Sequence, residues 1–161
     1  MKGDQAAIHG RHHLRYGLPA IALVGVLAAC SEPSPGPEAE VRSWIERGAA
    51  AAEARERDTL MDMISPAYAD SRGHNRARIG DILRFYFLRM NAIELIMSID
   101  EISVIGDSAA EARVTVGMAG KHDGALGFSA DAYQFAFELE KGGSDWRLIS
   151  ARWGELGKEL K

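Results

Sequence analysis

The spacing of apolar residues changes near Ala92 from a helical repeat to a repeat of two, and this change limits the fold more than any other feature. Before Ala92, apolar residues recur every three to four positions, as on the buried side of a helix. Over residues 92–153 apolar and polar residues alternate, which is typical of strands with one buried face. Because the helical segments precede the strands, the pattern predicts an α+β domain rather than an α/β domain.

Four strands are predicted in succession. Their alternating apolar positions cover 93–104, 110–118, 133–139 and 146–153. The first strand changes phase near Asp100-Glu101, which predicts a β-bulge. Gly106-Asp107 and 142–144 have the composition of turns, and 120–127 that of a polar loop. These short connections favour an antiparallel meander.

Three helical segments are predicted before the sheet. The first covers about 38–56, the second begins with Asp58 as its cap and ends before Pro66, and the third covers about 76–90 with Asn75 as its cap. Residues 65–73 between the last two form a loop or one short strand. The predicted architecture is therefore two to three N-terminal helices packed on a curved, mostly antiparallel sheet of four to five strands.

The third helix has one apolar side and two apolar residues on its charged side. The apolar side is formed by Ile79, Ile82, Leu83, Tyr86, Phe87 and Met90. Phe85 and Leu88 instead lie among charged residues, where solvent is expected. They either pack against the first helix or contact a second copy or another partner.

The first 29 residues have the composition of an export signal. Residues 1–15 contain Lys2, Arg11 and Arg15 against Asp4, and residues 16–29 carry no charge. A basic head, a short apolar middle and small residues at the end describe a secretory signal. The apolar run is shorter than the roughly 20 residues that a membrane-spanning helix needs.

Leu27-Ala28-Ala29-Cys30 resembles the lipobox of bacterial lipoproteins, and Cys30 is the only cysteine of the chain. The resemblance implies that the thiol of Cys30 is diacylated and that the chain is cut before it. Several acyl chains would hold the protein stably on a membrane, whereas one chain holds it only marginally. Ser31, in place of an aspartate, implies transfer to the outer membrane, with the domain facing the periplasm.

The expected organisation is a signal peptide over 1–29, a lipidated cysteine and tether over 30–37, a domain over 38–156 and a short tail over 157–161. The chain has 19 basic and 23 acidic residues, and removing the signal leaves 16 and 22, a formal net charge of −6. This excess of acids argues against nucleic acid as a partner and against a polybasic membrane patch.

The domain resembles the nuclear transport factor 2-like (NTF2-like) cone fold, which includes ketosteroid isomerase-like and polyketide cyclase-like proteins. Trp146-Arg147-Leu148-Ile149 followed by Trp153 resembles the closing strand of that superfamily, and Asp58-Thr59-Leu60 resembles the start of its second helix. Residues 65–87 are also similar to an uncharacterised group of bacterial lipoproteins. The resemblance implies a pocket between the concave face of the sheet and the helices. Enzymes of this fold place an Asp or His base there, with a Tyr or a protonated acid as oxyanion donor.

The residue types needed for such a pocket are present, but none matches a catalytic motif. We expect Tyr68, Tyr86 and Tyr133 as pocket candidates, with Tyr86 alternatively a core residue. Asp100 and Asp131 lie at a bulge or a strand end, and no histidine lies in a predicted strand. We therefore assign no catalytic residue and expect no cofactor.

Other polar residues have simpler interpretations. His74 and His122 are expected to be solvated loop residues, and no set of residues has the spacing of a metal site outside the predicted signal. Arg113 and Arg152 are expected to form cross-strand ion pairs. The arginines at 72, 76, 78, 84 and 89 either bind lipid headgroups or form a solvated helix face.

The sequence thus favours an outer-membrane lipoprotein whose domain binds a small apolar ligand or an envelope partner without catalysis. The alternatives are an isomerase- or cyclase-like enzyme and a homodimeric structural module. An open apolar cavity with a buried acid facing a tyrosine would favour the enzyme. A cavity filled by Met97, Phe135 and Phe137 would favour the structural module.

Overall fold

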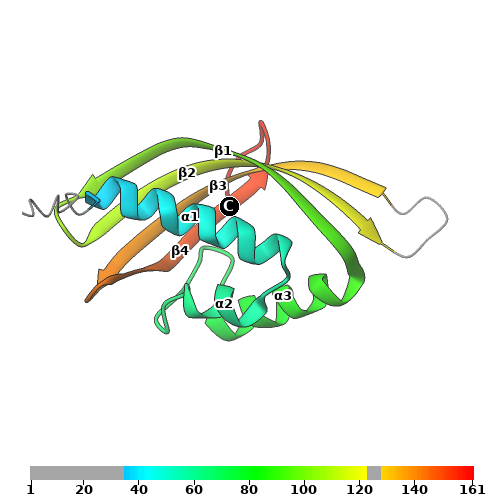
Figure 1. The fold of residues 1–161 in the computed structure, drawn as a ribbon, viewed down its shortest axis with the longest axis horizontal. Coiled ribbons are helices and arrows are strands. Elements are labelled where there is room, and N and C mark those ends of the chain that lie inside the picture. The colour runs from blue at the N-terminus through cyan, green and yellow to red at the C-terminus, as the bar shows by residue number, and fades with distance from the viewer. Residues whose placement is uncertain (1–34, 123–127) are drawn as a thin grey trace, which may run out of the picture. The chain divides into compact units, whose positions relative to one another are not determined.

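The computed structural model describes residues 35–122 and 128–161, in which three helices precede four strands (Figure 1). The elements are α1 (Pro37–Glu53), α2 (Arg57–Asp62), α3 (Arg76–Arg89), β1 (Met90–Ile105), β2 (Ala109–His122), β3 (Phe128–Gly142) and β4 (Asp145–Glu155). The predicted α+β class is confirmed, with four strands in the described sheet. The predicted signal peptide, Cys30, most of the tether and part of the 120–127 loop lie outside the described residues.

The sheet is an antiparallel meander in the order β1-β2-β3-β4. Ile99 pairs with Val114 and Glu101 with Arg113, so Asp100 is the extra residue of the predicted bulge. Two further register shifts were not predicted: one lies between Met90 and Ala92 of β1, and the other leaves Ile149 of β4 without a partner in β3. Bulges bend a strand and increase its twist, and the sheet in Figure 1 curves around the helices.

The core lies between α1 and the concave face of the sheet. Val41, Trp44 and Ile45 of α1 are buried against strand residues that include Val114 and Leu139. The small side chains at positions 110 and 112 of β2 belong to the same core, which lets the helix approach the sheet closely. Residues 34–161 form one compact unit around this core.

The starts of α1 and α3 agree with the sequence, but that of α2 differs. At α3, the side chain of Asn75 accepts a hydrogen bond of 2.9 Å from the backbone N–H of Arg78, which confirms the predicted cap. At α2, Glu56 rather than Asp58 occupies the cap position, so that prediction is wrong. The Glu56 carboxylate accepts a hydrogen bond from the Thr59 hydroxyl. Asp58 lies in the first turn instead, where its negative charge is near the positive end of the helix.

Fewer residues of α3 pack against the rest of the domain than the apolar side of the helix predicted. Ile79 and Leu83 pack on a second buried cluster, but Tyr86 is 50% exposed and is therefore not a core residue. Phe85 and Leu88 are 55% and 76% exposed, so the proposed packing against α1 is wrong. The reason is geometric: α1 lies across the sheet and covers it (Figure 1), so that no other described element covers the outer side of α3. None of the helices in 35–122 and 128–161 is long and apolar enough to cross a membrane.

Candidate functional site

The loop that connects α2 to α3 lies against β4. The backbone N–H groups of Ser65 and Ala69 donate to the carbonyl oxygens of Leu148 and Ile149, at 2.9 and 3.1 Å. Ile64 forms an isolated parallel bridge with Leu148, so the predicted short strand is only a bridge. Because β4 is an edge strand of the described sheet, this loop protects backbone groups that would otherwise be exposed.

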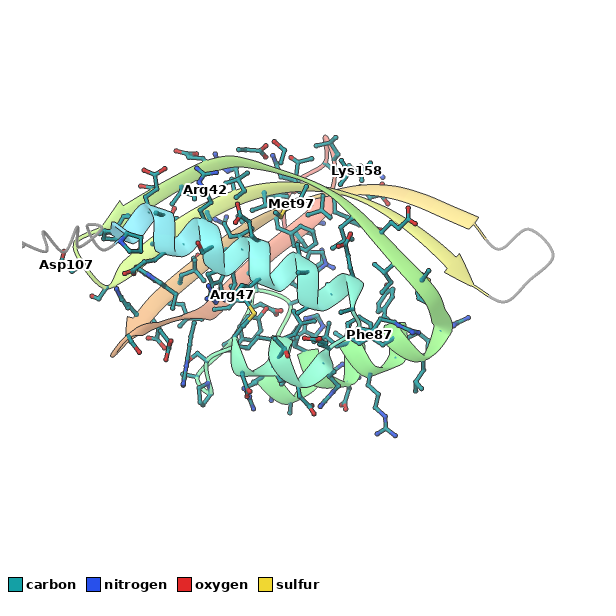
Figure 2. All side chains as sticks on the ribbon, viewed as in Figure 1. Arg42, Arg47, Phe87, Met97, Asp107 and Lys158 are labelled. Carbon is teal, nitrogen blue, oxygen red and sulfur yellow. The ribbon has the colours of Figure 1, made fainter. Side chains whose placement is uncertain are left out.

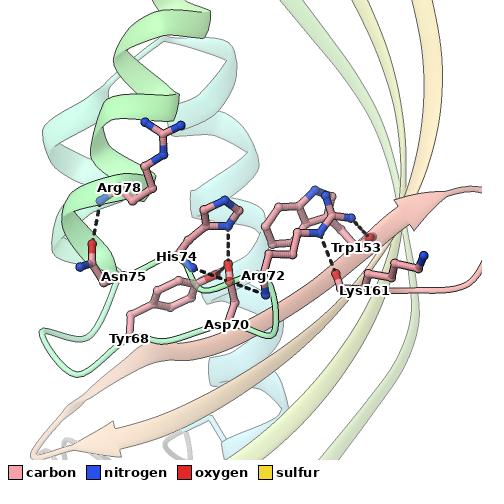
Figure 3. Close-up of polar contacts among 8 residues, drawn as sticks. All are labelled: Tyr68, Asp70, Arg72, His74, Asn75, Arg78, Trp153 and Lys161. Atoms are coloured by element: carbon pink, nitrogen blue, oxygen red, sulfur yellow. Dashed lines mark hydrogen bonds and ion pairs between the residues drawn. The ribbon is translucent and has the colours of Figure 1, made fainter.

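A buried carboxylate, Asp70, organises this loop. Its side chain is fully buried and accepts four hydrogen bonds (Figure 3). Oδ1 accepts from the backbone N–H groups of Arg72 and His74, at 2.9 and 2.8 Å. Oδ2 contacts the Tyr68 hydroxyl at 3.1 Å and His74 Nδ1 at 2.9 Å. Tyr68, Asp70 and His74 form the group that we call the loop network.

The protonation of the loop network follows from these contacts. Burial alone raises the pKa of Asp70, but the hydrogen bonds from His74 and Tyr68 outweigh it and hold the pKa below its usual value. Burial, together with the neighbouring carboxylate, raises the pKa of Tyr68. Tyr68 therefore remains a donor, and Asp70 is ionised at neutral pH. Since an ionised carboxylate only accepts hydrogen bonds, Nδ1 of His74 carries the hydrogen between them.

Trp153 of β4 extends the loop network toward the end of the chain. The His74 ring stacks on the Trp153 ring at 5.9 Å, and the Arg72 guanidinium lies 4.3 Å from the centre of the same indole. Arg72 also donates to the carbonyl oxygens of Trp153 and Lys161, at 2.7 and 3.1 Å. The His74 side chain is only 23% exposed, so its prediction as a solvated loop residue is wrong.

Some apolar residues of the concave face pack on the buried clusters and others do not. Where α1 covers it, Val114 and Leu139 are about 1% exposed. On the same face, Leu95, Tyr133 and Phe135 are partly buried and belong to neither buried cluster, although Phe135 pairs with Val114. The Phe135 ring lies 6.5 Å from the Tyr133 ring and 5.6 Å from the Phe137 ring. This apolar area, which we call the open concave face, is where the resemblance places a ligand.

The structure does not bring the three predicted tyrosines together. The hydroxyl of Tyr68 is engaged with Asp70, and Tyr86 is exposed on α3 beside Phe85, at a ring distance of 6.2 Å. Tyr133 is the one candidate that lies on the open concave face. Asp70 and the contact of His74 with it were not predicted, although the sequence places an Asp and a His four positions apart beside Tyr68.

The remaining polar candidates from the sequence lie on the convex face of the sheet or have side chains outside the described residues. Asp100 is exposed and accepts a hydrogen bond from the Thr115 hydroxyl. Arg113 pairs with Glu101 across the strands at 2.9 Å, as predicted, and Arg152 is exposed. The side chains of His122 and Asp131 lie outside the described residues. In the described part of the chain, no group of three or more His, Cys, Asp or Glu side chains is arranged to hold a metal ion.

Two hollows lie beside the helices. One of about 360 Å³ is lined by Ala54, Arg55, Arg57, Arg84, Phe87 and Leu88. Phe87 lies between α3 and the end of α1 (Figure 2). The other, of about 520 Å³, lies between the helices and the start of β4 and has a mixed lining that includes Trp44, Trp146 and four charged residues of the helices and β4 besides Arg76. The first hollow places three guanidinium groups next to an apolar floor, an arrangement suited to a phosphate attached to an apolar group.

No protein-family model matches the sequence, and no curated protein matches it. The structure is similar to a ketosteroid isomerase-like protein from Erwinia carotovora atroseptica, with 12% identity, a TM-score of 0.62 and coverage of 75% of this chain and 97% of that one. It is also similar to a protein from Novosphingobium aromaticivorans named as a scytalone dehydratase, with 10% identity, a TM-score of 0.65 and coverage of 76% and 89%.

A third similar structure, named as a dehydratase of the NTF2-like family, comes from Streptomyces avermitilis. It has 14% identity, a TM-score of 0.63 and coverage of 74% of this chain and 97% of that chain. At such low identities the similarity shows the fold and no more. The domain therefore has the NTF2-like α+β cone fold, as the sequence resemblance implied.

Proposed function

We propose that the protein is an outer-membrane lipoprotein, anchored through Cys30 and facing the periplasm, whose NTF2-like domain binds a small apolar ligand or an envelope partner without catalysis. The observation that carries the binding assignment is that Leu95, Tyr133 and Phe135, which are partly buried on the open concave face, pack on neither buried cluster. Small-molecule sites are mostly apolar with a few polar groups that fix orientation. The rings of Tyr133 and Phe135, 6.5 Å apart, supply the apolar aromatic surface.

The loop network supports a non-catalytic function. The Asp70 carboxylate already accepts four hydrogen bonds, so it has no accepting position left for a ligand proton. Tyr68 is 3% exposed and its hydroxyl donates to Asp70, so it cannot donate to an oxyanion. The two groups that could act as base and donor are thus engaged with each other.

One observation favours an enzyme as the second candidate function. His74 donates through Nδ1 to Asp70 at 2.9 Å, which fixes the orientation of the imidazole. In the neutral ring, Nε2 then carries the free lone pair, as in a histidine that acts as a general base. A His74→Gln variant that loses binding of a ligand would fit either function, whereas turnover of that ligand by wild type would establish the enzyme.

The anchor is tested by labelling cells that express the full chain with radioactive or alkyne-tagged palmitate. Wild type should incorporate the label and fractionate with the outer membrane, and the Cys30→Ala variant should do neither. Label in both proteins, or an unmodified thiol in the intact mass of wild type, would refute the lipoprotein assignment.

The ligand site is tested on the soluble domain starting at Ser31, which contains the whole compact unit. Native mass spectrometry of the protein purified from its own host should show a co-purifying small molecule. The environment-sensitive dye 1-anilinonaphthalene-8-sulfonate should also bind and fluoresce. In the Phe85→Ser/Leu88→Ser background, which removes two exposed apolar residues of α3, Phe135→Glu should abolish dye binding, whereas Gln134→Glu, on the opposite face of the same strand, should leave it unchanged. Equal dye binding by both folded variants would refute the site.

A further inference from the structure

The outer side of α3 exposes apolar residues in a concentration found nowhere else in the described chain. Six large apolar side chains of the described residues are at least half exposed, and three of them, Phe85, Tyr86 and Leu88, lie within one helical turn. Scattered exposed apolar residues are ordinary, but a contiguous group marks a surface that contacts something apolar. Neither α1 nor the sheet covers this side of α3 (Figure 1).

Arginines flank these apolar residues. Viewed down the helix axis, at 3.6 residues per turn, an arc of about 140° contains in order Arg84, Leu88, Phe85 and Arg89. The helix has four arginines against one acid, Asp81, which lies on the same arc, although the whole chain has a net charge of −4. Among the described residues, neither Arg84 nor Arg89 pairs with a carboxylate. The Arg89 guanidinium instead lies 4.9 Å from the centre of the Phe85 ring.

The 360 Å³ hollow borders this side of α3 through Arg84 and Leu88. Arg55 and Arg57 reach it from the end of α1 and the start of α2. Arg55 donates to the carbonyl oxygen of Met90 at 3.0 Å, so its guanidinium is held in place. Arg57 donates to the carbonyl oxygen of Gly80 at 3.1 Å and also contacts Asp58. That carboxylate is 96% exposed, and such a surface pair leaves the guanidinium open to exchange with a phosphate.

We infer that the outer side of α3 docks on an anionic phospholipid surface. Phe85 and Leu88 enter the boundary between headgroups and acyl chains, and the arginines of α3 and of the hollow contact lipid phosphates. Guanidinium groups bind phosphate through paired hydrogen bonds, and a helix with a basic rim around aromatic and aliphatic residues is typical of interfacial binding. The excess negative charge on the rest of the chain would orient this side toward the membrane.

The inference extends the proposed anchor, because a lipid on Cys30 would place the domain near such a surface. Six residues separate Cys30 from Pro37, so the seven steps between them reach at most about 25 Å. A domain held that close to a bilayer must turn one of its sides toward the lipid. The basic, apolar side of α3 suits the boundary, whereas the convex face of the sheet carries acids such as Glu111 and Glu138.

The test uses the soluble domain starting at Ser31, so that an acyl chain cannot hold it on the vesicles. Sedimentation with vesicles of phosphatidylethanolamine and phosphatidylglycerol should show binding that weakens in high salt, with little binding to phosphatidylethanolamine alone. Arg84→Gln/Arg89→Gln should bind more than tenfold more weakly, since each arginine near an anionic surface contributes about fivefold. Phe85→Ser/Leu88→Ser should also lose binding at low salt.

The matched controls are Arg42→Gln/Arg47→Gln, which removes two exposed arginines from α1, and Ile96→Ser, which removes an apolar residue that is 83% exposed on β1. Both should bind like wild type, and circular dichroism should show that every variant is folded. Equal binding by all variants, or no preference for phosphatidylglycerol, would overturn the inference. A dimer that Phe85→Ser/Leu88→Ser converts to a monomer, without vesicle binding by wild type, would assign the surface to a second copy.

These outcomes are separate from those of the proposed function. Palmitate incorporation depends on Cys30 and not on α3, so it tests the anchor independently of vesicle binding. Dye binding at the open concave face should be unchanged in Phe85→Ser/Leu88→Ser. A protein that is acylated and binds the dye, but does not bind vesicles, would retain the proposed function and lose this inference.

Discussion

Replacing Asp70 by asparagine tests whether the loop network holds the α2–α3 connection on the sheet. Asparagine has nearly the same shape as aspartate, but one of its oxygens becomes an NH₂ group. The remaining oxygen can still accept from the backbone N–H groups of Arg72 and His74. The NH₂ group instead faces two other donors, the Tyr68 hydroxyl and His74 Nδ1, which lose their acceptor.

The expected loss of stability follows from those two contacts. A hydrogen bond to a charged group contributes about 1.5–3 kcal/mol, and an unsatisfied buried partner adds a penalty of similar size. Part of this free energy would be recovered if the Tyr68 hydroxyl rotated and the His74 ring changed tautomer, because both groups could then find other partners. We therefore expect Asp70→Asn to lower the free energy of unfolding by about 2–4 kcal/mol at pH 7. Tyr68→Phe, which removes one donor and leaves three, should lower it by about 1–2 kcal/mol.

The same variant should change how stability depends on pH. The pKa of Asp70 is lower in the folded protein than in the unfolded chain, so the unfolded chain binds the proton first as the pH falls. The stabilisation from the ionised carboxylate is therefore complete well above the ordinary aspartate pKa of about 3.9 and is lost as the pH falls through the lowered folded pKa. Because asparagine does not titrate, the difference between wild type and variant should shrink from pH 7 to pH 3.

Urea unfolding of the soluble domain, followed by tryptophan fluorescence at both pH values, measures these differences. Asp58→Asn is the matched control, because that carboxylate is 96% exposed in its pair with Arg57. It should change the free energy of unfolding by less than about 0.5 kcal/mol. The loop network does not stabilise the fold as described if Asp70→Asn lowers the free energy of unfolding at pH 7 no more than Asp58→Asn does. The same holds if the loss caused by Asp70→Asn is as large at pH 3 as at pH 7.

Three further substitutions test local features of the fold by urea unfolding. Asn75→Ala should lower stability by about 1 kcal/mol, because it removes the cap of α3; no loss would mean that the cap is dispensable. Arg55 has a φ of 58° at the end of α1, a conformation that glycine adopts more easily than residues with a Cβ. Arg55→Gly should therefore be about 1 kcal/mol more stable than Arg55→Ala, and equal stability would show that this backbone is unstrained. Gly154→Ala places a Cβ 2.7 Å from the carbonyl oxygen of Glu159, so it should detach the C-terminal tail and speed amide exchange at Lys161; unchanged exchange would contradict this packing.

The sequence predicted those parts of the fold that depend on neighbouring residues. Alternation of apolar and polar residues placed the strands, and a phase change located the bulge at Asp100. The Asn75 cap was predictable because a cap bonds to a backbone group three positions away. The prediction of three pocket tyrosines was less accurate, because the residue type alone does not determine where a side chain lies or which group its hydroxyl contacts. Only Tyr133 lies on the open concave face.

By itself, the sequence determined the α+β class, the order of helices and strands, the NTF2-like resemblance and the pattern that predicts an anchor at Cys30. The tertiary structure decided which surfaces are covered. A helical repeat shows which residues share a side, but a neighbouring element must be present to bury that side, and α1 covers the sheet rather than Phe85 and Leu88. His74 meets Trp153 from a position 79 residues away, because the bulged β4 strand and the α2–α3 loop fold against each other. No local pattern encodes such a contact, since it depends on the curvature of the whole sheet.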